Sequence, residues 1–304
     1  MTEDRRRRVT VLAVGGTIAM QGESAVPALD ATALASGLDV DARSIRQLPG
    51  PQLSLDDALA VAREAASEAA DGHGVVVTTG TDTLEELAVL TDVLHAGSNP
   101  VVFTGAIRPA SAAGADGPAN LADAVSVAAQ APPGTYVVFA GEVHAACEAR
   151  KTDSTSPRAF SSPRTGPLGY VAEDRVTPLA PRRPPSLQPA TLDFRVPVVA
   201  TWLGDDGAFV PRDVDGLVLV ALGGGHVSPA VLDALPRDVP IALTVRPERG
   251  AFLHSTYGFR GAEGDLRAAG VIAAATASPQ AARMRLLAAL GAGADPRAAL
   301  RDLA

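Results

Sequence analysis

The sequence predicts an α/β protein with a larger N-terminal domain, built on a mainly parallel sheet flanked by helices, and a smaller C-terminal α/β domain. Short runs of apolar, β-branched residues alternate with helical patterns at the spacing of β-α-β units. The runs at 9–14 and 75–77 lack polar alternation, which is typical of strands buried on both faces of a parallel sheet. A proline-dense stretch then interrupts the alternation. We expect domains at 1–176 and 196–304, joined by a linker at 177–195.

Composition limits the kind of protein. Of 304 residues, 47% are hydrophobic and 20% charged, which is enough apolar material for a sizeable core. A net charge of -8 opposes nucleic-acid binding, because contacts with phosphates need a basic face. Cys147 is the only cysteine, so neither an intramolecular disulfide nor a cysteine-based zinc site is available. The histidines lack metal-ligand spacing and no stretch is long enough to cross a membrane. We expect no metal, no cofactor, no nucleic acid and no membrane as partners.

The N-terminus carries a basic run, Arg5–Arg8, directly before the apolar run 9–14. This order is found in secretion signals, including the twin-arginine type. Here the apolar run is short, ends in two glycines and is followed by no small-residue cleavage site. We therefore expect a cytoplasmic protein.

Local signals place the remaining elements. The stretch 21–30 has no periodicity and predicts a mobile loop, which would serve as a lid. Helix starts are marked by N-capping residues, by capping-box spacing and by a proline in the first turn. The expected helices start at Asp30 or Thr32 and run through Leu38, start at Ser54 with Asp57 and run through Ala70, and start at Asp116 with Pro118. Further strands are expected at 100–104, 136–140, 165–171, 196–202, 217–222 and 241–245, and terminal helices at 278–290 and 296–303.

The stretch Val75–Leu87 carries the first candidate site. Its strand breaks at Gly80, and the polar residues Thr81–Thr83 follow before a helical pattern begins. Asp82 with Glu85 has capping-box spacing, so one interpretation limits these side chains to helix capping. The other interpretation is a ligand site, because ligands bind at the carboxyl ends of parallel strands.

The basic residues are used unevenly. Lys151 is the only lysine among 26 lysines and arginines. Arginine stays protonated in proteins, whereas a desolvated lysine can lose its proton. This solitary lysine suggests a chemical role, and chance in an arginine-rich composition is the alternative.

A second candidate site follows the first strand, at Gly15–Ala19. The glycines allow a sharp bend and a close approach to a ligand, and Thr17 adds a hydroxyl at the strand end. A nucleotide-binding protein is one alternative here. The full G-x-G-x-x-G spacing is absent, which weakens that alternative.

Four separated blocks now resemble the bacterial-type L-asparaginase and glutaminase-asparaginase family, in the same order and over essentially the whole chain. They are Gly15–Ala19, Thr79–Thr83, Gly114–Leu121, and Lys151-Thr152 with the segment 160–169. The first two together are highly specific. The resemblance implies an amino-acid amide substrate and a homotetramer built as a pair of dimers, with each site closed by the partner's C-terminal domain.

By match to these motifs, Thr17 is the family's first threonine, and Thr81, Asp82 and Lys151 are its second threonine, aspartate and lysine. Amide hydrolysis needs a nucleophile, a base and donors for the oxyanion. A neutral Lys151 would act as base through Thr81, and N–H groups at Gly80 and Thr81 would hold the oxyanion. Asp82 would orient the lysine or bind the substrate ammonium. Either Thr17 attacks the amide carbon and forms an acyl-enzyme, or both threonines activate a water. The expected substrate-binding residues are Gly16, Gly50, Gln52, Gly80, Thr81, Asp82, Ala106, His226 and Tyr257.

The match also departs from the family pattern. The loop tyrosine expected after Thr17 is missing from 20–29. The serine that contacts the substrate carboxylate aligns with Gly50, where a backbone N–H or the Gln52 side chain would take its task. The family's asparagine falls at His226, which is a substrate contact or a plain turn residue.

The family's glutamate falls near Tyr257, which is a substrate contact or a core residue. Its loss lowers the expected affinity for an ammonium group. We therefore expect hydrolysis of L-asparagine to L-aspartate and ammonia that is weak or altered in specificity. The alternative is a degenerate family member that binds an amino acid or effector without efficient turnover.

Overall fold

The computed structural model describes residues 7–21, 26, 27, 29–177, 186–249, 253, 256–274 and 277–301, and the statements below concern these residues. The chain divides into two compact units, Met1–Ser186 and Leu187–Ala304. The division falls within the stretch 177–195, whose role as a linker stays a prediction. Residues 178–185 of that stretch, and residues 22–25 and 28 of the predicted lid loop, lie outside the described part.

The first unit is built on an eight-stranded sheet. In spatial order its strands are β12 (Arg175–Val176), β11 (Gly169–Ala172), β8 (Glu142–Ala145), β7 (Gly134–Phe139), β6 (Pro100–Thr104), β5 (Gly74–Thr78), β1 (Val9–Ala13) and β4 (Asp41–Ser44). Strands β7, β6, β5, β1 and β4 pair in parallel, and β8, β11 and β12 extend the sheet with antiparallel pairs. Strands β1, β5 and β6 are buried along their whole length, as their apolar sequences predict.

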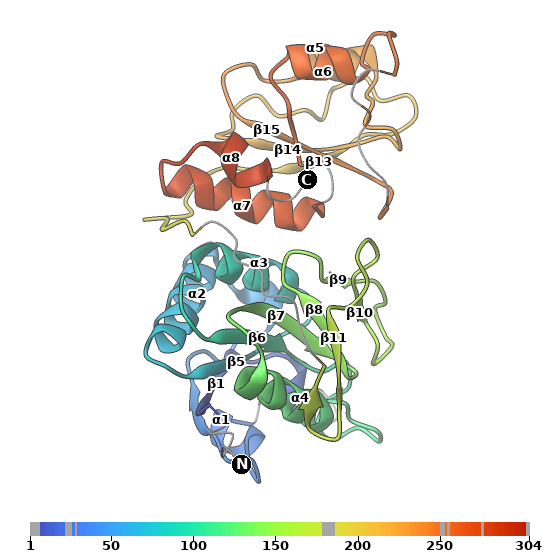
Figure 1. Ribbon diagram of the computed structural model, residues 1–304. Coiled ribbons are helices and arrows are strands. Elements are labelled where there is room, and N and C mark those ends of the chain that lie inside the picture. Colours follow the sequence, from blue (N-terminus) through green and yellow to red (C-terminus); the bar gives the residue numbers. More distant parts are fainter. Residues whose placement is uncertain are drawn as a thin grey trace. The chain divides into compact units, whose positions relative to one another are not determined.

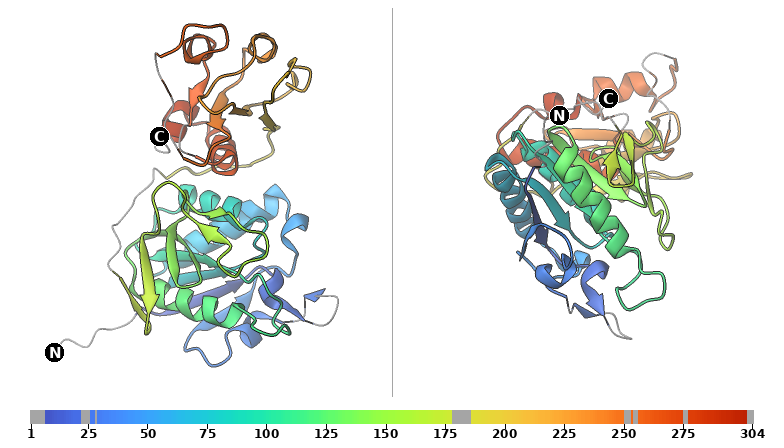
Figure 2. Two further views of the ribbon diagram at one scale, coloured as in Figure 1. Left: turned by 90° about the vertical axis from the view of Figure 1, so that its right-hand side faces the viewer. Right: turned by 60° about the horizontal axis from the view of Figure 1, so that its bottom comes forward.

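Helices cover both faces of this sheet (Figure 1). Helices α1 (Ala31–Leu34) and α4 (Gly117–Gln130) lie on one face, and α2 (Leu55–Ala70) and α3 (Leu84–Leu94) cover the other, as Figure 2 also shows. Alternate strand residues supply one core layer beneath α4, where Val11, Val76 and Val102 pack with Leu121 and Val127. Two short hairpins, β2 (Met20–Gln21) with β3 (Val26–Pro27) and β9 (Arg150–Lys151) with β10 (Phe160–Ser161), stand apart from the main sheet.

The second unit has its own four-stranded parallel sheet. Its strands are β13 (Val198–Ala200), β14 (Leu217–Ala221), β15 (Ile241–Val245) and β16 (Ile272–Ala273), and its helices are α5 (Pro229–Ala234), α6 (Glu263–Ala268), α7 (Pro279–Gly291) and α8 (Pro296–Arg301). Helices α5 and α6 lie on one face of the sheet, with α7 and α8 on the other (Figure 1). The two-domain α/β architecture confirms the predicted fold class. The described part of the chain holds no helix long and apolar enough to cross a membrane.

Two helices begin with the N-capping residues that the sequence predicts. The Ser54 hydroxyl accepts the Asp57 N–H at the start of α2, and the Asp57 carboxylate accepts the Ser54 N–H in return. Asp30 caps α1 through the Ala33 N–H. The predicted extension of α1 through Leu38 is wrong, because the helix already ends at Leu34. A turn follows it in which Gly37 has a φ of 86°, outside the helical range.

Asp116 precedes α4, as predicted, but its side chain makes no capping bond there. Its carboxylate instead accepts the N–H groups of Ile107 and Arg108, 3.0 and 2.8 Å away. Asn120 donates from its amide to the same carboxylate, at 3.1 Å, and to the Gly105 carbonyl oxygen, at 3.0 Å. The first turn of α4 therefore fixes the loop that follows β6.

A partly buried carboxylate, Glu68, ties α2 to two strands. Its Oε1 atom accepts the Thr10 hydroxyl at 2.9 Å and lies 2.7 Å from Nδ1 of His73. Its Oε2 atom accepts a hydrogen bond from Arg43 at 2.8 Å. Burial raises the pKa of Glu68, but the hydrogen bonds from His73, Arg43 and Thr10 outweigh burial and bring this pKa to about 2.

This depressed pKa makes stability depend on pH. The ionised Glu68 carboxylate makes its full contribution to the free energy of unfolding above the pKa that a glutamate has in the unfolded chain. This contribution is lost as the pH falls from there toward about 2. Between pH 5 and pH 3, wild-type protein should lose about 2 kcal/mol more unfolding free energy than Glu68→Gln. Urea unfolding at both pH values measures the difference. Equal losses in the two proteins would contradict this role for Glu68.

Candidate active site

The predicted site residues of the first unit lie on loops that follow neighbouring parallel strands. Strands β4, β1, β5 and β6 are adjacent and run in the same direction, so their carboxyl ends share one edge of the sheet. The loop after β1 carries Gly16 and Thr17, the loop after β4 carries Gly50 and Gln52, the loop after β5 carries Gly80, Thr81 and Asp82, and the loop after β6 carries Ala106. The fold therefore collects on one edge residues that are distant in sequence.

Three of these loops meet backbone to backbone, with no side chain between them. A Cβ atom on Gly16 would lie 2.3 Å from Cα of Gly80, and one on Gly80 would lie 3.1 Å from the main-chain nitrogen of Gly50. Gly16 also has a φ of 85°, which favours glycine. Thr17 and Thr81 each follow one of the two touching glycines directly. The structure thus places the two threonines on neighbouring loops.

Lys151 reaches this edge from the hairpin of β9 and β10. Its Nζ atom donates to Oγ1 of Thr81 at 2.9 Å and to Oδ1 of Asp82 at 2.7 Å. The Lys151 side chain is 18% exposed and that of Asp82 64%, so the amine lies below the carboxylate and beside a buried hydroxyl. The structure brings Thr81, Asp82 and Lys151 together.

The capping-box prediction for Asp82 and Glu85 is wrong. Thr83 is the residue that precedes α3, and no side chain caps this helix. The Asp82 carboxylate is engaged by the Lys151 ammonium, because a charge-assisted hydrogen bond is stronger than one to a main-chain N–H. The interpretation of Asp82 and Thr83 as mere helix caps therefore fails.

Aromatic packing holds the hairpin that carries Lys151. Phe160 pairs with Lys151 in the antiparallel register of β9 and β10. The Phe160 ring stacks on Phe139 at the end of β7, with ring centroids 4.5 Å apart and an interplanar angle of 29°. Since Phe139 belongs to the main sheet, this contact anchors the hairpin to the sheet.

Gly50 faces a hydroxyl that has no partner. The Thr83 Oγ1 atom is buried and makes no hydrogen bond within the described part of the chain. A Cβ atom on Gly50 would lie 2.8 Å from this oxygen, so a side chain at position 50 requires the Thr83 side chain to move. Gly50 is itself buried, whereas Gln52 and its side chain are exposed.

The remaining predicted residues, His226 and Tyr257, belong to the second unit. The His226 ring contacts Tyr257 and Phe259 edge-on, with centroids 5.0 Å apart in each pair. Tyr257 is 48% exposed, so its interpretation as a core residue is wrong. The tyrosine ring packs on the histidine at the surface rather than in the apolar interior. Within this unit the structure brings His226 and Tyr257 together.

A carboxylate that no sequence pattern indicated, Glu263, joins these two residues. Its Oε1 atom accepts the Tyr257 N–H at 2.8 Å, and its Oε2 atom lies 3.2 Å from Nε2 of His226. The N–H groups of Tyr257 and Thr256 hold the pKa of Glu263 below its usual value. Its place at the start of the short helix α6 gave no periodic signal.

Family models match both parts of the chain. The model described as "Asparaginase, N-terminal" matches residues 8–183, and the model described as "Glutaminase/Asparaginase C-terminal domain" matches residues 195–302. The chain belongs to the asparaginase family. The motif resemblance found in the sequence is confirmed.

The sequences of several relatives align with this asparaginase-family chain over most of the length of both proteins. A probable L-asparaginase of Deinococcus radiodurans is 33% identical, with 95% of this chain and 94% of the relative covered. A probable periplasmic L-asparaginase of Haemophilus influenzae is also 33% identical, with 95% and 90% covered. The solved thermostable L-asparaginase from Thermococcus kodakarensis has a TM-score of 0.84 and 26% identity, with 97% and 96% covered. A probable cytoplasmic L-asparaginase from Campylobacter jejuni has a TM-score of 0.79 and 25% identity, with 98% and 99% covered.

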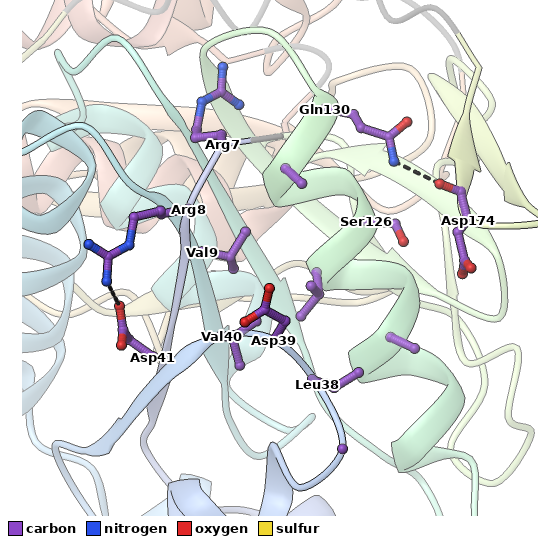
Figure 3. A pocket seen from close by; sticks show the side chains of 14 residues that line it. Arg7, Arg8, Val9, Leu38, Asp39, Val40, Asp41, Ser126, Gln130 and Asp174 are labelled. Atoms are coloured by element: carbon purple, nitrogen blue, oxygen red, sulfur yellow. Dashed lines mark hydrogen bonds and ion pairs between the residues drawn. The ribbon is translucent and has the colours of Figure 1, made fainter. Parts of the chain in front are cut away.

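This member of the asparaginase family also has a cavity of about 480 Å³ near the amino ends of β1 and β4, away from the carboxyl edge. The cavity lies between residues 37–41 and α4 (Figure 3). Arg8 pairs with Asp41 at 2.9 Å on one side, and the Gln130 amide donates to the Asp174 carbonyl oxygen at 2.7 Å on the other. None of the predicted site residues lines this cavity. Among the described residues, no group of His, Cys, Asp and Glu is arranged to hold a metal ion.

The contact between the Gly16 and Gly80 backbones can be tested with a matched control. Gly37 has nearly the same φ as Gly16, 86° against 85°, but a Cβ atom there meets nothing within 4 Å. Gly37→Ala should cost about 1 kcal/mol of unfolding free energy from backbone strain alone. Gly16→Ala should cost at least about 2 kcal/mol more, because its Cβ meets the neighbouring loop and because its ψ of -177° lies in a region that only glycine adopts readily. Urea unfolding measures both, and equal costs would contradict the close approach.

Proposed function

We propose that this protein hydrolyses the side-chain amide of L-asparagine to L-aspartate and ammonia. The observation that carries the proposal is the hydrogen bond from the Lys151 amine to the Thr81 hydroxyl, 2.9 Å long, at the carboxyl edge of the sheet. An amine beside a buried hydroxyl is suited to move a proton. The names of the relatives, a probable L-asparaginase and a solved L-asparaginase among them, support the same activity.

Each step of the proposed reaction has a candidate group. The Thr17 oxygen attacks the amide carbon, and its proton passes through Thr81 to a neutral Lys151. The N–H groups at Gly80 and Thr81 stabilise the oxyanion. The proton returns to the leaving nitrogen, so that ammonia departs and an acyl-enzyme remains. Water then cleaves the ester and regenerates the Thr17 hydroxyl. In the alternative, Thr17 and Thr81 activate a water that attacks directly.

Substrate binding is assigned by charge and exposure. The Asp82 carboxylate is 64% exposed beside the amine and is proposed to bind the substrate ammonium group. The main-chain N–H of Gly50 or the exposed Gln52 side chain takes the substrate carboxylate. Gly16 and Ala106 line the same edge through their main chains.

We also propose a homotetramer, a pair of dimers, for which the family resemblance is the support. In the second unit, His226 and Tyr257 are proposed as substrate contacts. A cytoplasmic location is favoured by the weak secretion signal and by the cytoplasmic name of the Campylobacter jejuni protein. The Haemophilus influenzae relative is named periplasmic, so fractionation of the native cells is the test.

Substitution of Lys151 separates its charge from its basicity. Lys151→Arg keeps a cation beside Asp82 but cannot lose a proton, so ammonia release from L-asparagine should fall at least ~100-fold. Lys151→Met and Thr17→Ala should abolish it. A coupled ammonia assay measures all three, with Arg158→Ala as the exposed control. Full activity of Lys151→Met and Thr17→Ala would disprove the proposed mechanism.

The departures from the family pattern predict a weak grip on the substrate. No side chain at Gly50 can bind the substrate carboxylate, and the expected glutamate is replaced near Tyr257. The KM for L-asparagine should therefore lie well above the micromolar range. Initial rates with L-asparagine, L-glutamine and β-aspartyl amides, measured in parallel, give KM and preference. A micromolar KM for L-asparagine would contradict this prediction.

A further inference from the structure

One hydroxyl at the carboxyl edge of the sheet has no role in the reaction above. Thr83 directly precedes α3, and its Oγ1 atom is buried and makes no hydrogen bond within the described part of the chain. A hydroxyl that is withdrawn from water without a partner is unfavourable, so native proteins pair almost all such groups. Thr83 therefore offers a hydrogen-bonding group, unused by the described residues, beside the proposed substrate site.

The backbone of Thr83 explains why its hydroxyl does not cap the helix. A side chain at this position reaches the N–H groups of the first turn when its own backbone is extended. Three other helices begin in this way, with ψ between 155° and 168° and a hydroxyl that accepts an N–H: the caps are Ser54 of α2, Ser228 of α5 and Ser278 of α7. Thr83 has a ψ of 10° and forms no such bond. Its hydroxyl is thus available for a role outside the helix.

The Thr83 hydroxyl faces Gly50 on the loop after β4. A Cβ atom on Gly50 would lie 2.8 Å from Oγ1 of Thr83, and the next nearest atoms, Cγ2 and the main-chain nitrogen of Thr83, would lie 3.7 Å away. Gly50 is not among the glycines with positive φ, so its backbone does not itself require glycine. The Thr83 hydroxyl therefore stands beside the place that a side chain at position 50 would occupy.

The chemistry of the proposed substrate suits this position. In L-asparagine one carbon atom carries both the ammonium and the carboxylate group, so the partners of these two groups must lie close together. Asp82, which is proposed to bind the ammonium group, is the residue before Thr83, and its carboxylate is 64% exposed. Gly50, whose N–H is proposed for the substrate carboxylate, faces the hydroxyl. A hydroxyl is a neutral donor, so it can bind a carboxylate without competing with the ammonium group for Asp82.

We propose that the Thr83 hydroxyl donates a hydrogen bond to the α-carboxylate of the substrate and so makes the site selective for amides that carry this group. The inference rests on the proposed function and extends it to a residue that touches the substrate but not the reacting amide. Oγ1 is covered while Thr83 as a whole is partly exposed, so rotation about the Cα–Cβ bond uncovers the hydroxyl. This rotation uses part of the binding energy, which agrees with the high KM predicted above.

Binding of L-aspartate, the product of the proposed reaction, tests the contact without turnover. Thr83→Val keeps the shape of the side chain and removes the donor, so the dissociation constant for L-aspartate should rise about tenfold. The dissociation constant for β-alanine, which is L-aspartate without the α-carboxylate, should not change. Ligand-observed NMR titration measures both constants. In the ammonia assay, KM for L-asparagine should rise by a similar factor while kcat stays unchanged.

Thr135→Val is the matched control. The Thr135 hydroxyl is also buried and makes no hydrogen bond among the described residues, but it lies at the amino end of β7. This variant should bind both ligands as the wild-type protein does. A pair of variants then moves the hydroxyl across the contact. Thr83→Ala should weaken L-aspartate binding, and adding Gly50→Ser should restore it, because alanine removes the oxygen that lies 2.8 Å from the new Cβ atom.

Two results overturn the proposal. One is an unchanged dissociation constant for L-aspartate in folded Thr83→Val. The other is an equal loss of affinity for L-aspartate and β-alanine, which indicates a purely structural role. Should Thr83→Val not fold, the same two results in Thr83→Ala overturn it.

The two proposals fail in different ways. If wild-type protein binds L-aspartate but releases no ammonia from any amide, the proposed function fails, and the titrations still decide the role of Thr83. If wild-type protein is active and neither KM nor L-aspartate binding depends on Thr83, only the inference fails.

Discussion

The amine of Lys151, hydrogen-bonded to Thr81 and Asp82, joins a separate hairpin to the carboxyl edge of the main sheet. The threonine and the aspartate end a parallel strand, whereas the lysine lies 70 residues away from Thr81 on a hairpin beyond β7. The strand β8 reverses direction after β7, and the hairpin of β9 and β10 that follows places Lys151 beside Thr81. The stacked rings of Phe139 and Phe160 hold this return in place. The hairpin that follows the antiparallel strand β8 thus brings a lysine amine to an edge formed by parallel strands.

A second constraint is the absence of side chains where the loops meet. A Cβ atom on Gly16 would lie 2.3 Å from the Gly80 backbone, which no Cβ atom tolerates, and one on Gly80 would lie a tight 3.1 Å from the Gly50 nitrogen. Because the glycines occupy the contacts, the next residues, Thr17 and Thr81, stand beside them on adjoining loops. The Thr83 hydroxyl, which makes no hydrogen bond within the described part of the chain, lies next to Gly50 and would have to shift for a larger residue there. Close backbone packing, rather than side-chain contact, thus sets the spacing of the candidate nucleophile and the relay residue.

Much of this fold could be predicted from the sequence, because apolar runs such as 75–77 and 217–222 define buried parallel strands without knowledge of their neighbours. The failures have physical reasons. Asp82 has the spacing of a helix cap, but its partner is a lysine that no local pattern connects to it. Tyr257 has apolar neighbours, yet its ring packs on His226 at the surface. Two-residue strands such as β16 and six-residue helices such as α6 are too short for a periodic signal.

Asp82 and Glu85 lie three residues apart but differ in burial. Asp82 is 64% exposed, so solvent and salt screen its attraction for the Lys151 amine. Glu85 is 7% exposed in the first turn of α3, and burial raises the pKa of its carboxyl group. Of the two acids, the exposed Asp82 is therefore the one that can exchange the lysine for a substrate ammonium group at small cost, as the proposed function requires.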